Sequence, residues 1–586
     1  MRIMSILLMV VVPAWAGVPS PSHHEDGAAG AGGNLTGTWK LVVLGFSYGD
    51  HELAIVQLDE RPATATAAIV ASQRMLLGIP TAAEVALKGD RLTLALKGRS
   101  GGHEFQGRLV HDGPDAGKFL GIFPIRGEIY PARLERTTER SLGPLQSSPL
   151  IARYYAATRE RDPKAKVKKL EALIEGNTRS SSHWIYPDLL SEAAAAGLTG
   201  KEVGALVGRW IDEAKPHGES WLSEVRIKAL RAIIDHPPYA QTSLELARAA
   251  NEAVGEQVSA EQRLSLARLL ARAAGLAGQS DLAREAAARA DRLESQVDAE
   301  YLKKLLPFQP ARYAGRKDPK ADRVVLLELF TGAQCPPCVA ADVAFDALLK
   351  TYQPTELIGL QYHLHIPGPD PLTTKDSEAR QEYYGDAFIG TPTTCFNGRA
   401  EASGGGPLSA SRNKYDEYRP IIDRELEGRK AATIELSATR AGDAIQVVAK
   451  ASLPTKATAR ENDKSSKKAE ASATRPFLRL ALTEESIRYI GGNGMRFHHH
   501  VVRAFPGGPK GKELASGEGQ VTVTIKLAEL RRDLERSLRD VAKQGGLPKA
   551  LPELALKDLA VVAFVQDDAD KRVLHAVSVP VREASP

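Results

Sequence analysis

The stretch from Arg323 to Leu349 constrains the fold of this chain more than any other. It reads "RVVLLELFTGAQCPPCVAADVAFDALL". The segment Arg323 to Phe330 is an apolar run of strand length, and apolar residues recur with helical spacing after Cys338. The pattern predicts a strand, a tight turn and a helix, with Cys335 near the helix N-terminus.

That position favours reactive sulfur chemistry. Unpaired amide N–H groups and the helix dipole stabilise a thiolate over a thiol at a helix N-terminus. Pro336 suits the first helical turn because it has no N–H to leave unpaired. Cys338 lies one turn further on, close enough to close a short disulfide ring. We predict a redox-active dithiol, with a metal clip and an inert disulfide as the alternatives.

The N-terminus has the pattern of a secretory signal peptide. Arg2 is followed by an apolar stretch, Ile3 to Val12, which is too short to span a bilayer. Ala14-Trp15-Ala16 offers small residues on either side of a cleavage site. We expect residues 1–16 to be removed and the protein to be exported, periplasmic or extracellular; the alternative is an uncleaved anchor. After cleavage we expect no stable transmembrane segment.

Composition excludes several classes of protein. The formal charge of +5 over 586 residues does not require a nucleic-acid partner, and we expect none. Three cysteines in so long an exported chain exclude a disulfide-rich scaffold. The fold must therefore depend on packing, which leaves the cysteine pair free for chemistry. We expect no cofactor.

Changes of pattern divide the chain into regions. Short alternating runs precede about Ser141, amphipathic helical patterns follow, and strand-like runs return after Gly428. Pro237-Pro238 should separate two helices, and Gly278 should join two more with the small-residue spacing of a tetratricopeptide repeat. The alternative to a repeat scaffold is a plain helical bundle. The predicted regions are a signal peptide (1–16), a flexible leader (17–33), a β-barrel or sandwich (34–140), a helical domain (145–310), an α/β domain (321–428) and a β-sandwich (430–583).

The α/β region resembles the thioredoxin-like superfamily, particularly its exported bacterial members with a Cys-Pro-Pro-Cys centre. A second element supports the resemblance: "GTPTTCFNG", from Gly390 to Gly398, looks like the family's cis-proline loop, strand and Asn-Gly hairpin. The resemblance implies that Pro392 lies against the disulfide and that Thr391 pairs with substrate backbone. The predicted fold class is multidomain, with an α/β thioredoxin-like domain flanked by a helical domain and two β-rich domains.

Two positions depart from the family pattern. Gln334 stands where the family often has Trp, and Leu329 stands where reductases often place a buried Asp as a proton acceptor. Glu328 is one residue away and should point to the other face of the strand. Glu328 resembles a residue usual in a group of secreted thioredoxin-like proteins, so it is a candidate proton relay; the alternative is a paired structural carboxylate.

The metal alternative requires further ligands. His363 and His365 alternate onto one face of "QYHLHIPG" and could join Cys335 and Cys338 around zinc or copper. Cys395 reads as a buried free thiol.

The region after Gly428 resembles the β-sandwich that follows the thioredoxin module in certain secreted bacterial envelope proteins. We therefore predict an exported thiol-disulfide oxidoreductase that acts on envelope proteins. Its partners would be protein thiols or disulfides and an unidentified redox partner. The alternatives are a non-enzymatic interaction protein that uses a thioredoxin scaffold, and a Cys/His metal carrier.

Overall fold

The computed structural model divides the chain into two compact units, Met1–Val297 and Asp298–Pro586. It describes residues 35–61, 64–98, 101–144, 150–176, 181–255, 257–454, 474–544 and 554–584. The predicted signal peptide and leader lie outside these residues. No helix among the described residues combines the length and the apolar character needed to cross a membrane.

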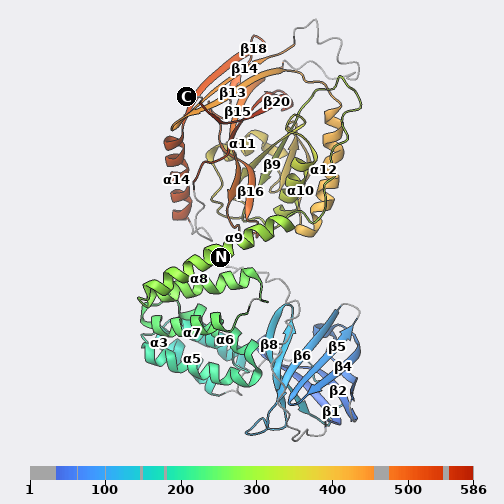
Figure 1. Cartoon of the computed structure of the whole chain (residues 1–586), viewed down its shortest axis with the longest axis vertical. Helices are drawn as coiled ribbons and strands as arrows, with labels where there is room; N and C mark the ends of the chain where they lie inside the picture. The colour runs from blue at the N-terminus through green and yellow to red at the C-terminus, as the bar shows by residue number, and fades with distance from the viewer. Residues whose placement is uncertain are drawn as a thin grey trace. The chain divides into compact units, whose positions relative to one another are not determined.

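The first unit begins with a closed antiparallel barrel, drawn in blue in Figure 1. Each strand pairs with the next, and β8 pairs back with β1. Alternate residues face an apolar interior that includes Trp39, Leu94 and Phe105, all at most 2% exposed. Of the two predicted alternatives, barrel or sandwich, the structure shows the barrel. Its strands are β1 (Gly37–Phe46), β2 (Gly49–Arg61), β3 (Thr64–Ser72), β4 (Pro80–Lys88), β5 (Arg91–Gly98), β6 (Gly101–Leu109), β7 (Phe119–Ile125) and β8 (Glu128–Arg136), with the short helix α1 (Arg74–Leu77) between β3 and β4.

Helices complete the first unit. Their starts follow local chemistry: Thr199 and Glu202 form a capping box before α5, and Asp162 caps α3 just before Pro163. The predicted break at Pro237 is confirmed, and Gly278, with φ of 72°, separates α8 from α9 as expected. The helices are α2 (Leu150–Thr158), α3 (Pro163–Glu175), α4 (Tyr186–Glu192), α5 (Gly200–Ala214), α6 (Glu219–Ile233), α7 (Ala240–Glu252), α8 (Ala260–Leu276) and α9 (Ser280–Lys304), which continues into the second unit.

The second unit is built on one nine-stranded sheet. Its strands follow the order β12-β11-β9-β10-β16-β15-β19-β20, and β17 pairs with β15. Within it β9 and β10 are parallel, and β16 adds to β10 in parallel through Gln361 and Val501. Its strands are β9 (Val325–Thr331), β10 (Leu357–His363), β11 (Thr393–Phe396), β12 (Arg399–Ser403), β15 (Pro476–Arg488), β16 (Phe497–Ala504), β17 (Lys512–Glu513), β19 (Leu559–Asp567) and β20 (Val573–Pro580).

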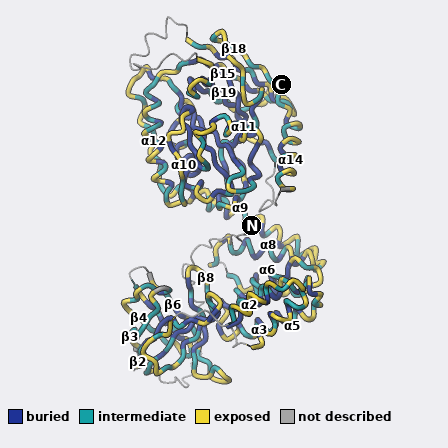
Figure 2. Tube along the Cα trace, turned by 180° about the vertical axis from the view of Figure 1, so that it is seen from behind, coloured by how far each residue is buried: buried dark blue, intermediate teal, exposed yellow. Residues whose placement is uncertain are grey.

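The two faces of this sheet are covered differently. One face carries a continuous core that includes Phe330, Tyr362, Val502 and Phe564. On the other face, helices α10 (Val339–Thr351) and α12 (Ser411–Leu426) cover the β9 end. A smaller sheet and α14 (Leu527–Gln544) cover the β15–β19 end. The smaller sheet has the order β18-β14-β13-β21, with β13 (Thr433–Ala441), β14 (Ala444–Ser452), β18 (Glu518–Lys526) and β21 (Arg582–Glu583). Figure 2 shows the central strands as buried.

The predicted fold class is wrong. A closed eight-stranded barrel forms the first β region, and residues 321–428 do not stand as an α/β thioredoxin-like domain flanked by a separate β-sandwich. Their strands are four of the nine in a sheet that the C-terminal strands complete. The physical reason is that β10 is not an edge: β16 pairs with it and prolongs the apolar face of β9 and β10 into that of β15 and β19.

The boundary predicted at residue 428 can be tested by excision. A fragment of residues 322–428 would lose Val502, Phe505 and Phe564 from the core that contains Tyr362, and a buried side chain of this size contributes about 1.5–3 kcal/mol. We expect that fragment to lack cooperative unfolding by circular dichroism, whereas residues 298–586 should unfold cooperatively. A short fragment that melts cooperatively would show that residue 428 is a domain boundary after all.

Candidate functional site

The predicted strand, turn and helix around the cysteines are present. β9 ends at Thr331, Cys335 precedes a 3₁₀ turn from Pro336 to Cys338, and α10 follows at once. The amide of Cys335 donates to the Gly332 carbonyl (3.0 Å) and that of Cys338 to the Cys335 carbonyl (3.1 Å). Cys335 and Cys338 form a disulfide with their Cα atoms 5.3 Å apart.

The predicted proline loop lies against this disulfide. The Thr391–Pro392 peptide bond is cis, as expected, and the Thr391 carbonyl oxygen lies 3.8 Å from the Cys335 Sγ. Cys395, three residues after Pro392, is a free thiol and is buried. The segment "GTPTTCFNG" therefore reaches the cysteines.

A glycine-rich segment also lies against the cysteine turn, next to Pro392. The amide of Gly406 donates to the Pro337 carbonyl (2.7 Å), and the Ala340 amide donates to the Gly406 carbonyl (3.0 Å). A Cβ atom on Gly405 would lie 1.8 Å from the Pro337 oxygen and 2.9 Å from Pro392 Cγ. Only glycine fits this close backbone approach.

Both cysteines are enclosed. Cys335 is 1% exposed and Cys338 is 0% exposed, so neither residue is appreciably more accessible than the other. Pro336 and Pro337 are nevertheless exposed. Two well-exposed apolar side chains, Ile389 (76%) and Leu408 (43%), lie close in sequence to the segments that contact the disulfide.

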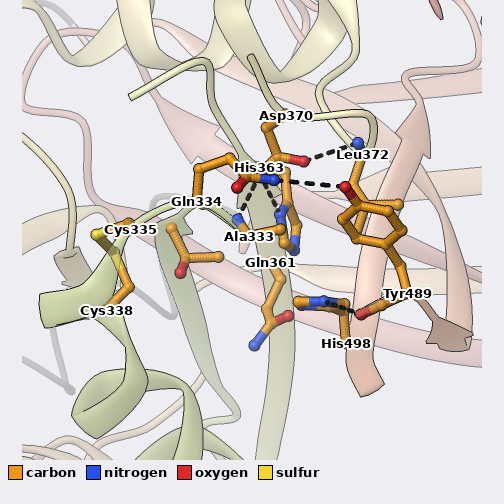
Figure 3. A network of polar contacts seen from close by, with 12 residues as sticks. Ala333, Gln334, Cys335, Cys338, Gln361, His363, Asp370, Leu372, Tyr489 and His498 are labelled. Carbon is orange, nitrogen blue, oxygen red and sulfur yellow. Dashed lines mark hydrogen bonds and ion pairs between the residues drawn. A yellow bond between two sulfur atoms is a disulfide. The ribbon is translucent and has the colours of Figure 1, made fainter. Parts of the chain in front are cut away.

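A buried carboxylate holds the turn that precedes Cys335 (Figure 3). Asp370 Oδ2 accepts from the Ala333 amide (2.5 Å) and lies 2.9 Å from His363 Nδ1, while Oδ1 accepts from the Leu372 amide (2.8 Å). Burial pushes the pKa of Asp370 upward, but His363 and these hydrogen bonds outweigh burial and lower it. The carboxylate is thus a negatively charged anchor under the cysteine turn.

The same contacts occupy the two histidines of the metal alternative. His363 bonds to Asp370, and His365 Nδ1 accepts from the Asp370 amide (3.1 Å). Within the part of the chain that the structure describes, no group of three or more His, Cys, Asp or Glu side chains is arranged to hold a metal ion. The two histidines and two sulfurs therefore do not form the ligand set that this alternative requires.

A second buried carboxyl group lies on α10. Asp342 follows Cys338 by four residues, a spacing that places both on one face of a helix. Its Oδ2 accepts from Thr331 Oγ1 (3.0 Å), and its Oδ1 lies 3.4 Å from Gln361 Nε2. Burial raises the pKa of Asp342 to about 7, so this side chain can take up or release a proton near neutral pH.

Glu328, the predicted candidate relay, has structural partners. It is fully buried and accepts from Arg380 Nε (2.8 Å) and Nη2 (2.9 Å), Tyr362 OH (3.0 Å) and Tyr384 OH (2.5 Å). Burial raises the pKa of Glu328, but the Arg380 charge and the hydrogen bonds from Arg380 and the two tyrosines together outweigh burial and lower it. These contacts favour the paired structural carboxylate over the relay, which remains a prediction.

Sequence reasoning missed the residues that hold the site together. Asp342 carried a usable signal, since it is a charged residue four positions after Cys338 in a first helical turn that is otherwise apolar. Asp370, in the loop "IPGPDPL", and Arg380, on α11 (Lys375–Tyr384), carried none. The residues that they hold near the site, Ala333 and Glu328, lie 37 and 52 positions earlier in the chain.

The buried ion pair predicts a large difference between two arginine substitutions. Arg380→Met leaves the Glu328 charge buried and unpaired, which should lower the free energy of unfolding of the second unit by about 3–5 kcal/mol. The matched control is Arg412→Met, at an exposed pair with Asp416, which should change it by less than about 1 kcal/mol. Hydrogen exchange of β9 and α11 peptides over a urea series measures both; equal losses would contradict the role given to Arg380.

The raised pKa of Asp342 predicts a pH effect of defined sign. The folded pKa, about 7, lies above that of an unfolded aspartate, so the neutral form is favoured by folding. The stability contributed is full below about pH 4 and is lost as the pH rises to about 7. Asp342→Asn, which stays neutral, should therefore gain stability relative to the wild type between these pH values.

Infrared spectroscopy can observe the proton on Asp342 directly. The band of a protonated carboxyl group should titrate near pH 7 in the wild type and be absent in Asp342→Asn. The control is Asp346→Asn, one turn further along α10 and also buried, which should keep the band. If Asp342→Asn retains the band, another group carries the proton.

Comparisons with known proteins place the chain in no family. No protein-family model matches it, and no curated protein does. One similar solved structure is HBP35 of Porphyromonas gingivalis, with 16% identity and a TM-score of 0.31 over 45% of this chain and 80% of that one. Another is a domain of the outer membrane lipoprotein Omp28 from the same organism, with 16% identity and a TM-score of 0.17 over 27% of this chain and 92% of that one.

Proposed function

We propose that this protein is an exported thiol-disulfide oxidoreductase whose reactive pair is Cys335 and Cys338. The observation that carries the proposal is the disulfide at a strand-to-helix turn, with the Thr391 carbonyl 3.8 Å from the Cys335 sulfur. In the oxidised state the sulfur lies beside a backbone segment that can orient an extended polypeptide. The N-terminal signal pattern supports export. Export would place the cysteine pair in an oxidising compartment, where disulfides persist.

The exchange reaction balances within this pair and one partner. With the dithiol reduced, the Cys335 thiolate attacks a partner disulfide, forms a mixed disulfide and releases one partner thiolate. The Cys338 thiolate then attacks the Cys335 sulfur, restores the Cys335–Cys338 disulfide and releases the second partner thiolate. The dithiol loses two electrons and two protons, and the partner leaves as two thiols. The reverse sequence oxidises the partner.

Asp342 is suited to the proton transfer in this cycle. Cys338 must lose its proton before it can attack the mixed disulfide, and Asp342 lies one helical turn away with a pKa of about 7. A buried base with that pKa accepts a proton at neutral pH and returns it when the dithiol re-forms.

The surroundings of the disulfide fit a protein partner. Pro336 and Pro337 are exposed, as are Ile389 and Leu408. A partner with apolar residues near its own disulfide or thiol would cover this surface and remove it from water.

Burial of the disulfide favours a second candidate function. With Cys335 at 1% and Cys338 at 0% exposure, an incoming sulfur needs the Gly404–Gly406 segment or the Thr391 segment to move. If neither moves, the disulfide is a structural cross-link in a non-enzymatic interaction protein.

A trapping experiment separates the two candidates. Cys338→Ser removes the thiol that resolves the mixed disulfide, so the reduced variant should accumulate mixed disulfides through Cys335 when offered a denatured disulfide protein. Cys335→Ser should trap much less, and Cys395→Ala should behave like the wild type, because Cys395 is buried. Mass spectrometry identifies the linked cysteine. If Cys338→Ser traps nothing, the disulfide is structural.

A further inference from the structure

We infer that the loop from Gly491 to Gly494 belongs to the exchange site, where Asn493 and Gln334 are positioning residues that set the stability of the Cys335–Cys338 disulfide. This inference rests on the proposed function. It assigns a role at the cysteines to a segment about 155 residues further along the chain, between β15 and β16.

The loop forms hydrogen bonds with the three residues that precede Cys335. Asn493 donates through its amide to the Ala333 carbonyl (3.1 Å) and through Nδ2 to the Gly332 carbonyl (3.3 Å). The Gly492 amide donates to Gln334 Oε1 (3.1 Å), and Gln334 Nε2 lies 3.4 Å from Tyr489 OH. Figure 3 shows the Gln334 side chain reaching from the cysteine turn toward Tyr489, which lies on the side away from the cysteines.

At Gly491 the loop lies too close to the cysteine turn to leave room for a side chain. A Cβ atom on Gly491 would lie 2.3 Å from the Ala333 carbonyl oxygen, which is backbone and cannot swing aside. Gly494 has φ of 86°, which favours glycine. The sequence "GGNG" therefore satisfies the geometry of this contact.

The loop is held at both ends, so it acts as a fixed support. Tyr489 (4% exposed) packs with Ala333, Leu372 and Val501, and Met495 (4%) packs with Leu305 and Val343. Within the loop, Asn493 Oδ1 accepts from the Met495 amide (3.0 Å). Ala333 is consequently held through its amide by Asp370 and through its carbonyl by Asn493.

This double hold affects the two redox states unequally. In the oxidised state the S–S bond itself restrains the turn. In the dithiol state only the hydrogen bonds keep Cys335 close to Cys338. They raise the effective concentration of one thiol at the other and so favour closure of the disulfide. Weakening the hold should make the disulfide easier to reduce.

The test uses the full chain in glutathione redox buffers. One oxidised glutathione plus the dithiol gives the disulfide plus two reduced glutathiones, so electrons and protons balance. After quenching and alkylation, mass spectrometry of the peptide with Cys335 and Cys338 gives the equilibrium constant. Asn493→Asp keeps the Oδ1 acceptor and loses the Nδ2 donor. The constant for oxidation should fall by about two- to tenfold, the range for loss of one net hydrogen bond; tenfold corresponds to about 30 mV.

Matched variants keep the test decisive. Asp570→Ala, in the β19–β20 turn, also loses one side-chain hydrogen bond to the backbone (3.0 Å from Arg572 N), but away from the cysteine turn, and should leave the equilibrium constant unchanged. Gln334→Ala should lower the constant as Asn493→Asp does, and it replaces that variant if Asn493→Asp fails to fold. The contrary result is that Gln334→Ala, and Asn493→Asp if it folds, each lose thermal stability while the equilibrium constant for oxidation stays at the wild-type value. In that case the loop is only structural and the inference is overturned. If no ratio of reduced to oxidised glutathione reduces the wild-type disulfide, the proposed function is wrong, and this inference fails with it.

Discussion

The second unit depends on one buried ion pair, between Glu328 in β9 and Arg380 in α11. Both side chains are at most 1% exposed, and a charge placed there without its partner would be strongly unfavourable. Arg380 also donates to Gln566 in β19 (2.8 Å), and Gln566 donates to the Lys571 carbonyl (2.6 Å). The strand that leads to the cysteines is thereby tied to strands from the far end of the chain. These polar contacts join the same strands, β9 and β19, as the apolar core that includes Phe330 and Phe564.

The sequence was informative wherever the pattern was local. The strand, turn and helix around Cys335 and the helix break at Gly278 could be predicted, because neighbouring residues determine them. The contact of Thr391 with Cys335, 56 residues apart, could be predicted only from the resemblance of the segment Gly390 to Gly398 to a known loop. The alternation that placed Glu328 on the opposite face of β9 was also a sound guide. By contrast, the pairing of β10 with β16 joins Gln361 to Val501, and no local pattern records which distant strand lies alongside. The sandwich and the barrel share the same alternation, so sequence alone could not separate them for the first β region.

The disulfide that we propose to be reactive is also enclosed by the surrounding chain. Asp370 and Asn493 fix the chain before Cys335, Gly406 and Thr391 lie against the cysteine segment, and Asp342 lies on the helix behind it. A site arranged in this way excludes water, which strengthens each electrostatic contact within it. In the proposed exchange reaction, a partner would have to displace a covering segment. Selectivity among partners would then depend on the ability to replace the backbone contacts of Gly406 or Thr391 as much as on the sulfur chemistry.

The hydrogen bonds between the cysteine turn and the Gly491–Gly494 loop also bear on the order of events during synthesis. The residues that meet are 158 and 161 positions apart, so the ribosome needs roughly ten to thirty seconds to produce the second partner after the first. The core around Cys395 is likewise incomplete until Phe564 arrives. For that interval all three thiols belong to a nascent chain without their final neighbours. Wrong pairing with Cys395 is then limited by how soon Cys335 and Cys338 find one another across two prolines, before the C-terminal strands take up their places.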